Sequence, residues 1–385
     1  MTTGRTALIA GGGIGGLTVG TLLAQRGWQV RVLERGNEIR EIGAGIYIKN
    51  NSIEVFEEMG VFDRLQPLGS ALQWARVVDS QGKTLQIRDN HTGKARVWVF
   101  PRQALVETLY QAAVEAGVDV QTGQHVAGAR RDGTLVLDNG REERADLIVG
   151  ADGVHSAVRK ALAPESTYRA LGTVINRYLL PDQELVEPGI TLENWSGRRR
   201  IGITPCGAHH TYVYQVSPAN DPHAGALPND IEDWSAAFPR LRRAFEKFAV
   251  AEVLQAPYSI VSCKRWAHGR VALIGDAAHG MPPTLGQGAG ITIINGRALV
   301  HFLDQHSNVE DAVRTWEQKV RFIADHTQRW ALRYDYFSRQ WPQQLWPLRD
   351  PIIWAFRNFP QLNRRMRIAD RGLEVAGIPV GASPA

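Results

Sequence analysis

The hydrophobic residues near the start of the chain fall into a strand–helix–strand pattern. Residues 7–10 and 30–33 are short apolar runs, and the leucines between them recur at helical spacing up to Gly27. A unit of about thirty residues with this order is typical of a βαβ crossover and favours a parallel sheet. We therefore predict an α/β domain at the beginning of the chain.

Two later stretches alternate apolar and polar residues, as strands with one buried face do. The first covers residues 71–98, and the second covers residues 175–263 with the segments RRRIGITP, HTYVYQVSP and YSIVSCKRW. Helical patterns lie at residues 101–117 and 309–340. The pattern predicts one α/β domain interrupted twice by β-rich insertions, which together form a second sheet domain.

The composition limits the class of protein. The 385 residues are 44% hydrophobic, and no run of 18 uncharged apolar residues is present that would cross a membrane. The N-terminus lacks the succession of basic, apolar and small residues of a signal peptide, and Cys206 and Cys263 do not make a disulfide framework. We expect a cytoplasmic protein with no stable membrane association.

The formal net charge of +5 indicates either a solvated basic surface or a preference for anionic ligands. Residues 357–372 are rich in arginine but show no pattern of a nucleic-acid-binding module, so no nucleic-acid partner is expected. His209, His210 and His279 are not accompanied by further ligands at metal spacing, and no metal site is predicted.

The motif Gly11-x-Gly13-x-x-Gly16 lies between the first predicted strand and helix. The first glycine suits a tight turn, the second a close approach of a pyrophosphate, and the third the packing of helix on sheet. Glu34 ends the second strand, where a ribose-binding carboxylate belongs. The alternatives are a Gly-rich turn without a ligand and, for Arg35, a solvated side chain in place of a phosphate contact.

A second glycine cluster, GDAAHGMPPTLGQGAG, spans residues 275–290. Asp276 is either an ordinary helix N-cap or a partner for a ribityl or ribose hydroxyl. Residues 286–290 begin a helix whose free N–H groups suit an anion on a ring carbonyl, such as the one that a reduced flavin carries. Arg102 in a first helical turn opposes the helix dipole, a conflict that a pyrophosphate would remove.

These motifs, with GADGVHSAVR at residues 150–159 between them, resemble the single-component (group A) flavoprotein aromatic hydroxylases over residues 5–330. The resemblance implies FAD, NADH or NADPH, and O₂, with one oxygen atom inserted into an electron-rich ring through a flavin C4a-hydroperoxide. It also implies cofactor roles for Arg102, Asp152 and Val126. The local alternatives are that Asp152 is a turn residue and that Val126 is a core residue. The predicted cofactor-binding residues are Gly11, Gly13, Gly15, Gly16, Glu34, Arg35, Arg102, Val126, Asp152, Asp276, Gly286, Gln287, Gly288 and Ala289.

Within that family the segments GAGIYIKNN, RRIGITPC and HTYVYQVSPANDP, together with Asn295, resemble the pyridine-ring oxygenases of the 2-methyl-3-hydroxypyridine-5-carboxylate type. This resemblance implies pyridine degradation, a small aromatic carboxylate as substrate and ring opening as a possible further step. It places substrate contacts on Arg200 and Tyr212. Without the resemblance, the alternatives are a solvated arginine on a strand and a tyrosine that serves only packing. An aromatic wall is expected to keep the site dry. Its candidates are Trp74, Trp98, Trp195, Tyr212 and Tyr214.

The fold expected from the resemblance is α/β, with a Rossmann-like FAD-binding domain, an inserted β-sheet substrate domain and C-terminal helices. The predicted FAD-binding domain comprises residues 1–70, 99–174 and 264–310. The substrate domain comprises residues 71–98 and 175–263, and the helical region comprises residues 311–385. Alternatives are a monooxygenase of a phenolic or quinone-precursor substrate and a non-catalytic FAD-binding protein; a homodimer is possible.

Overall fold

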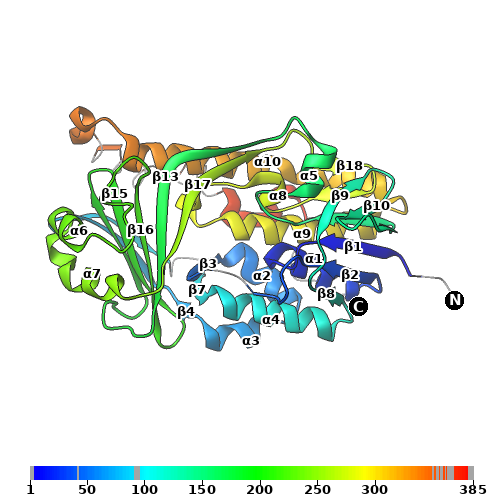
Figure 1. Ribbon diagram of the computed structural model, residues 1–385, viewed down its shortest axis with the longest axis horizontal. Helices are drawn as coiled ribbons and strands as arrows, with labels where there is room; N and C mark the ends of the chain where they lie inside the picture. Colours follow the sequence, from blue (N-terminus) through cyan, green and yellow to red (C-terminus); the bar gives the residue numbers. More distant parts are fainter. Residues whose placement is uncertain are drawn as a thin grey trace.

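The computed structural model describes residues 4–40, 43–90, 96–348, 351–352, 355, 359, 361 and 368–379. Two large sheets lie at opposite ends of the molecule, and the long helix α10 (Val309–Asp335) runs along both (Figure 1). Both described chain ends lie on the side of the first sheet. The arginine-rich segment 357–372 and the C-terminal helices expected after residue 348 lie mostly outside the described residues.

The first sheet has six strands, and all neighbours except the β18–β19 pair are parallel. Its order is β18 (Ala267–His268), β19 (Val271–Leu273), β12 (Leu147–Gly150), β1 (Thr6–Ala10), β2 (Gln29–Leu33) and β8 (Asp119–Gln121). The crossover from β1 to β2 is helix α1 (Ile14–Ala24), so the predicted βαβ unit is present. This sheet and its helices share one large hydrophobic core. The predicted fold class is confirmed.

The helices around the first sheet form the frame of the glycine loops. Helix α9 packs against α1 and α10, and α1 packs against α4. Their bounds are α2 (Asn50–Glu58), α3 (Phe62–Leu65), α4 (Arg102–Glu115), α5 (Ala157–Leu162), α8 (Asp276–His279) and α9 (Gly288–Gln305). Short 3₁₀ turns are η1 (Gln66–Leu68), η2 (Pro239–Leu241), η3 (Pro283–Leu285), η5 (Gln343–Leu348) and η6 (Ile368–Ala376). The helix predicted at residues 309–340 is α10 followed by one π-helical segment, η4 (Tyr336–Gln340).

The second sheet has seven strands, antiparallel except for the parallel β14–β5 pair. Its order is β17 (Leu254–Ser262), β13 (Thr167–Leu180), β16 (His210–Pro218), β15 (Arg199–Cys206), β14 (Ile190–Ser196), β5 (Trp74–Asp79) and β6 (Thr84–Asp89). Two small sheets complete the fold. They are β11 (Glu142–Arg144), β10 (Thr134–Leu137) and β9 (Val126–Arg130), and β3 (Gly45–Lys49), β7 (Val97–Pro101) and β4 (Ser70–Ala71). The second sheet draws its strands from both predicted insertions, and β13 begins eight residues before the proposed boundary at residue 175. The division of the chain into domains stays a proposal.

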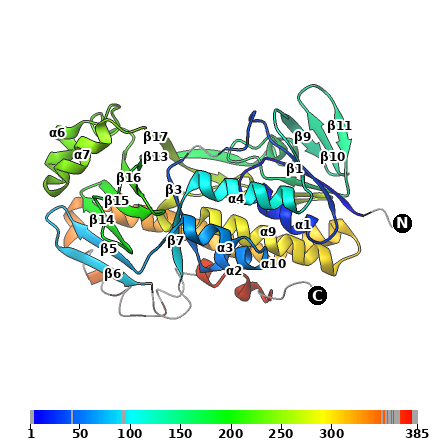
Figure 2. The same ribbon diagram turned by 90° about the horizontal axis from the view of Figure 1, so that it is seen from below.

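Successive side chains along each strand of the second sheet point to opposite faces of the sheet, and the two faces pack against different parts of the molecule. Ile201, Ile203 and Val213 point to one side and pack against helices α6 (Ile231–Ala237) and α7 (Arg242–Ala249). Figure 1 shows these helices on the outer face, and Figure 2 shows β5, β6, β14 and β15 from below. The polar residues at the alternate positions therefore face the first sheet.

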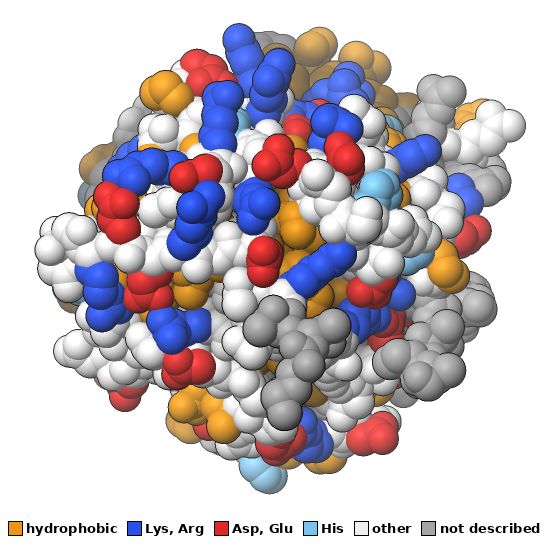
Figure 3. All heavy atoms as spheres, turned by 90° about the vertical axis from the view of Figure 1, so that its right-hand side faces the viewer, with side chains coloured by type: hydrophobic (Ala, Val, Ile, Leu, Met, Phe, Trp, Pro, Cys, Tyr) orange, Lys and Arg blue, Asp and Glu red, His pale blue; other side chains and the backbone are white. Residues whose placement is uncertain are grey.

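The surface on the side of the first sheet carries basic and acidic side chains interleaved with each other (Figure 3). Several of these charges form surface ion pairs, such as Arg130 with Glu142 and Arg31 with Asp119. On this face the excess of positive charge does not gather into one continuous patch. Among the described residues, no helix has the length and apolar character needed to cross a membrane.

Candidate active site

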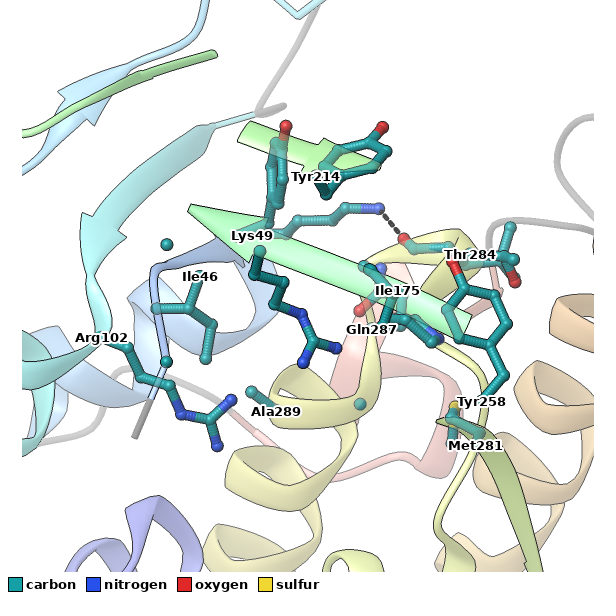
Figure 4. A pocket seen from close by; sticks show the side chains of 18 of the residues that line it. Ile46, Lys49, Arg102, Ile175, Tyr214, Tyr258, Met281, Thr284, Gln287 and Ala289 are labelled. Atoms are coloured by element: carbon teal, nitrogen blue, oxygen red, sulfur yellow. Dashed lines mark hydrogen bonds between the residues drawn. The ribbon is translucent and has the colours of Figure 1, made fainter. Parts of the chain in front are cut away.

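A cavity of about 730 Å³ lies between the two sheets (Figure 4). Its walls come from segments far apart in the sequence: the glycine loop after β1, strand β3, the loop before α9, and the inner faces of β13 to β16. The cavity is therefore bounded by the nucleotide-binding elements on one side and by the second sheet on the other. Both parts of the predicted site meet in this single space.

The glycine loop after β1 is shaped by two close backbone contacts. Gly11 has φ of +102°, and a Cβ there would lie 2.5 Å from the carbonyl oxygen of Ala151. A Cβ on Gly16 would lie 2.0 Å from the carbonyl oxygen of Gly11. The turn therefore closes only with glycine at both positions. It brings the start of α1, including Gly13 and Gly15, to the cavity wall.

Two helices begin at the cavity without a side-chain cap. The N-cap residues of α1 and α9 are Gly13 and Gln287, and neither makes a capping hydrogen bond or is followed by an acidic residue in the first turn. The N–H groups and partial positive charge of a helix start favour anionic or carbonyl ligands. Gly286, Gln287, Gly288 and Ala289 all line the cavity. A Cβ on Gly288 would meet no atom within 4 Å, so there is room beside the start of α9.

Asp276 lies on the cavity wall at the first position of α8, after the N-cap Gly275. It is exposed, whereas the other residues of the segment 271–280 are buried. Asp276 is therefore not itself the N-cap. Asp276 lies on the cavity side of the segment, where its carboxylate suits the hydroxyls of a polyol chain.

The C-terminal segment η6 supports the loop before α9. Asp370 accepts a hydrogen bond from Gln287 Nε2, and Asn51 Nδ2 donates to the carbonyl oxygen of Ala369 at 2.7 Å. Lys49 Nζ donates to the carbonyl oxygen of Leu285 at 2.8 Å, the contact drawn as a dashed line in Figure 4. These contacts fix the shape of the loop that carries Gln287.

Arg102 lies at the first position of α4 and on the cavity wall. Its backbone N–H donates to the carbonyl oxygen of Ala44 at 2.9 Å, and a Cβ on Gly43 would lie 2.8 Å from its Cδ. In Figure 4 its guanidinium points toward Ala289 at the start of α9. The cation is thus directed at the part of the cavity where the uncapped helix begins.

Six of the predicted cofactor residues do not line the cavity: Gly11, Gly16, Glu34, Arg35, Val126 and Asp152. Glu34 accepts hydrogen bonds from the backbone N–H groups of Gly12 at 2.7 Å and Gly36 at 2.8 Å. Asp152 Oδ2 accepts from Ala157 N at 2.7 Å, at the start of α5, while its buried Oδ1 has no hydrogen-bond partner among the described residues. Both carboxylates hold loop backbone, and direct ligand roles for them remain predictions.

On the substrate side, a transverse row of residues crosses the second sheet. In register, Arg177 of β13 pairs with Tyr214 of β16, Tyr214 with Gly202 of β15, and Gly202 with Glu193 of β14. A Cβ on Gly202 would lie 2.0 Å from Cζ of Tyr214. Because Gly202 has no side chain, the Tyr214 ring crosses β15 and its hydroxyl donates to Glu193 Oε2 at 2.9 Å.

Arg200 lies beside this row among the residues that line the cavity, with 3% of its side chain exposed. Its Nη1 lies 3.1 Å from Glu193 Oε1, its Nη2 lies 3.8 Å from Asp335 Oδ1, and its guanidinium carbon lies 5.9 Å from the rings of both Trp195 and Tyr334. Burial is the largest single influence and lowers the pKa of Arg200, but Glu193 and the neighbouring tyrosines together outweigh it, so the net pKa is raised. The cation is therefore already matched by carboxylates of the chain itself.

Four tyrosines of the cavity wall are held in the protonated form. Burial raises the pKa of Tyr47, Tyr212 and Tyr214, and raises that of Tyr258 to about 12. Arg177 lowers the pKa of Tyr212 without reversing this direction. None of these phenols is therefore a ready base near neutral pH, and a deprotonating role for Tyr212 is disfavoured.

The predicted aromatic wall is only partly correct. Tyr212 and Tyr214 line the cavity, whereas Trp74, Trp98 and Trp195 are not among its lining residues. Trp74 is 38% exposed at the start of β5, Trp98 stacks on Phe100 at 6.0 Å, and Trp195 is buried against Tyr334 on the same sheet face as Glu193. Tyr47, Tyr258 and Tyr334 complete the wall instead.

Sequence reasoning missed Glu193 and the role of Gly202. A strand period of two puts Thr191, Glu193 and Trp195 on one face of β14, and the single carboxylate on this strand was the available signal. The contact with Tyr214 depends on the register of three strands, which the sequence does not specify.

The residues present fit a flavin dinucleotide. Two uncapped helix starts, an arginine and an exposed aspartate converge on one cavity large enough to extend from the glycine loop to a second, tyrosine-lined sheet. Together with the Rossmann-like sheet, these features define a flavin-dependent oxidoreductase. The chain belongs to the family described as FAD binding domain, which matches residues 5–329.

Characterised relatives extend this assignment. The chain is 36% identical over 323 residues to a 2-heptyl-3-hydroxy-4(1H)-quinolone synthase of Mycobacteroides abscessus, covering 82% of this chain and 86% of that one. It is 31% identical over 331 residues to an aurachin C monooxygenase/isomerase of Stigmatella aurantiaca, covering 82% and 85%. Among solved structures, a tetrameric 2-methyl-3-hydroxypyridine-5-carboxylic acid oxygenase superposes with a TM-score of 0.84 at 30% identity, over 96% of each chain. The chain is an FAD-dependent monooxygenase.

Proposed function

We propose that the protein hydroxylates an N-heteroaromatic ring that carries a hydroxyl or oxo group and enters the cavity uncharged, using NADH or NADPH as reductant. One observation carries this choice of substrate: the buried Arg200 is already paired with Glu193. A ring carboxylate placed beside this pair would meet Glu193 as a like charge. The quinolone synthase among the relatives is named for a 3-hydroxy-4(1H)-quinolone, a ring of the proposed kind, which supports the proposal.

Bound FAD, once reduced, supplies the activation of O₂ and the transfer of one oxygen atom. The residues of the chain bind and orient the reactants. Arg102 and the start of α1 suit the pyrophosphate, Asp276 suits the sugar chain, and residues 286–289 suit one edge of the flavin ring. The second sheet then holds the substrate ring against Tyr212 and Tyr214 and keeps bulk water away.

A ring carboxylate, as in the pyridine-ring oxygenases, is the second candidate. The buried Nε of Arg200 has no hydrogen-bond partner among the residues that the structure describes, and Arg177 offers another cation on the same wall. For this class, Arg200→Ala should weaken binding of the acid about 30- to 1000-fold. It should change binding of the matching amide little. Equal losses for acid and amide would exclude Arg200 as the carboxylate ligand.

A substrate screen tests the proposal. Uncharged 4-quinolones, hydroxypyridines and their carboxylated analogues would be added to the FAD-loaded protein with NADH or NADPH. We expect faster NAD(P)H oxidation with matched O₂ uptake for the uncharged rings. Stimulation by carboxylated rings alone would favour the second candidate, and no stimulation by any ring would favour FAD binding without turnover. The tetrameric structural relative makes self-association a further proposal, which the mass of the particle in solution tests.

A further inference from the structure

Glu193 is the carboxylate on the substrate-sheet wall of the cavity, and three donors of the chain surround it. Trp195 Nε1 donates to Oε1 at 2.5 Å, Arg200 Nη1 lies 3.1 Å from the same oxygen, and the Tyr214 hydroxyl donates to Oε2 at 2.9 Å. Its side chain is 20% exposed, so it reaches the cavity surface. The three donors hold the Glu193 carboxylate in place, because a largely buried carboxylate requires hydrogen-bond partners on both oxygens.

The direction of these hydrogen bonds decides what a ligand can offer. Tyr214 gives its proton to Glu193, and its pKa is raised well above the ordinary value, mainly by burial and then by Glu193. The lone pairs of the Tyr214 oxygen and the remaining acceptor capacity of Oε2 are then left for a donor from the cavity. The site is thus complementary to an N–H or O–H group and not to an anion.

We propose that Glu193 and Tyr214 together accept the ring N–H or O–H of the substrate and take its proton, and that Arg200 is a positioning residue for Glu193. The inference rests on the proposed function and names the recognition chemistry of the same site. In the step, Tyr214 passes its proton to Glu193 Oε2 and receives the proton of the ring N–H or O–H. The electron pair of the broken bond stays on the ring, which becomes the anion that an electrophilic oxygen requires.

The neighbouring charges suit this transfer. Arg177 pairs in register with Tyr214 on the side opposite Gly202, so a cation lies on the cavity wall beside the place where the ring anion forms. When Glu193 becomes neutral, Asp335 still lies 3.8 Å from Arg200, but it is shared with Arg339, with which it forms a closer ion pair. The anion that forms on the ring then supplies the second negative charge of this cluster.

Three probes show how the ring N–H donor and a ring carboxylate each affect binding. They are 4(1H)-quinolone, its N-methyl analogue without the N–H donor, and the 2-carboxylated 4-hydroxyquinoline. Binding to the FAD-loaded, oxidised protein is measured by calorimetry, which does not depend on turnover. We expect the quinolone to bind at least tenfold more tightly than the N-methyl analogue. Glu193→Gln should weaken quinolone binding about tenfold or more and change that of the N-methyl analogue little.

The same variant makes an opposite prediction for the anion. Glu193→Gln removes the like charge and releases Arg200, so the carboxylated probe should bind more tightly to it than to the native protein. Tyr214→Phe should weaken the quinolone without strengthening the carboxylate. The matched control is Glu187→Gln in the exposed loop before β14, which should leave all three affinities unchanged.

Two contrary results can be told apart. If both quinolone probes bind and Glu193→Gln affects them equally, the acceptor role of Glu193 is wrong while the proposed function stands. If neither quinolone probe binds the FAD-loaded native protein, the proposed substrate class fails and the inference fails with it. If Glu193→Gln does not retain FAD, the Tyr214→Phe comparison of the two quinolones decides, and equal losses there would overturn the inference.

Discussion

The guanidinium of Arg200 and the carboxylate of Glu193 form a buried ion pair, with Nη1 3.1 Å from Oε1. A charge left behind in such a place costs more than the pair contributes, because the remaining partner is poorly solvated. Arg200→Met should therefore lower the free energy of unfolding by about 3–5 kcal/mol. The double variant Arg200→Met/Glu193→Gln should recover part of that loss in urea unfolding of the FAD-loaded protein. Equal stability of the single and double variants would show that the pair is not coupled.

Gly202 is the position that lets Tyr214 reach Glu193, and its substitution tests the row directly. The Cβ of Gly202→Ala would lie 2.0 Å from Tyr214 Cζ, so the ring must move and the contact with Glu193 is lost. Overpacking of this kind costs about 1–3 kcal/mol. Gly225→Ala, where a Cβ would make only ordinary contact at 3.6 Å, is the matched control. We expect the first variant to retain FAD but lose quinolone binding; retention of both would mean that the ring position does not matter.

The glycine turn after the first strand was predictable from sequence, because it depends on local backbone geometry. Gly11 and Gly16 follow a strand and precede a helix, and a short motif specifies that turn. The substrate half of the site was not, because Glu193, Gly202 and Tyr214 come from three strands whose pairing is set by tertiary structure.

The same contrast explains the partly wrong aromatic wall. Trp98 and Tyr212 look alike in sequence, as aromatic residues in alternating segments. Trp98 lies in β7, which pairs with β3 and β4, and its ring stacks on Phe100, whereas Tyr212 faces the cavity from β16. Which aromatic residues line a cavity depends on which sheet each strand joins.

Asp276 should contribute to FAD retention. It is the exposed carboxylate in an otherwise buried segment on the cavity wall, where it suits a sugar hydroxyl. Asp276→Ala should weaken FAD binding by about 1.5–3 kcal/mol, the value of a hydrogen bond to a charged group. Asp138→Ala, at an exposed aspartate in the β10–β11 turn, is the control. Equal FAD dissociation constants for the two variants, measured by flavin fluorescence, would remove Asp276 from the cofactor site.

His279 should make stability fall in mild acid. It is buried between Asn295 and Trp266, and burial lowers its pKa to about 4. The unfolded chain then binds a proton that the folded chain does not, so stability is present above about pH 6.5 and is lost as the pH falls toward 4. This group should account for about 2 kcal/mol of lost stability between pH 7.5 and pH 5. The urea-unfolding difference between these pH values should shrink in His279→Gln; an unchanged difference would mean that other groups carry it.

The most direct test of the central claim is incorporation of oxygen from ¹⁸O₂ into an uncharged ring. The FAD-loaded protein would be incubated with NADH or NADPH, ¹⁸O₂ and 4(1H)-quinolone, and the products would be analysed by mass spectrometry. We predict a hydroxylated quinolone that carries one ¹⁸O atom, formed in proportion to the NAD(P)H consumed and strongly reduced in Glu193→Gln. Labelled product from the carboxylated ring but none from the quinolone, or NAD(P)H consumption that neither ring stimulates, would contradict the account.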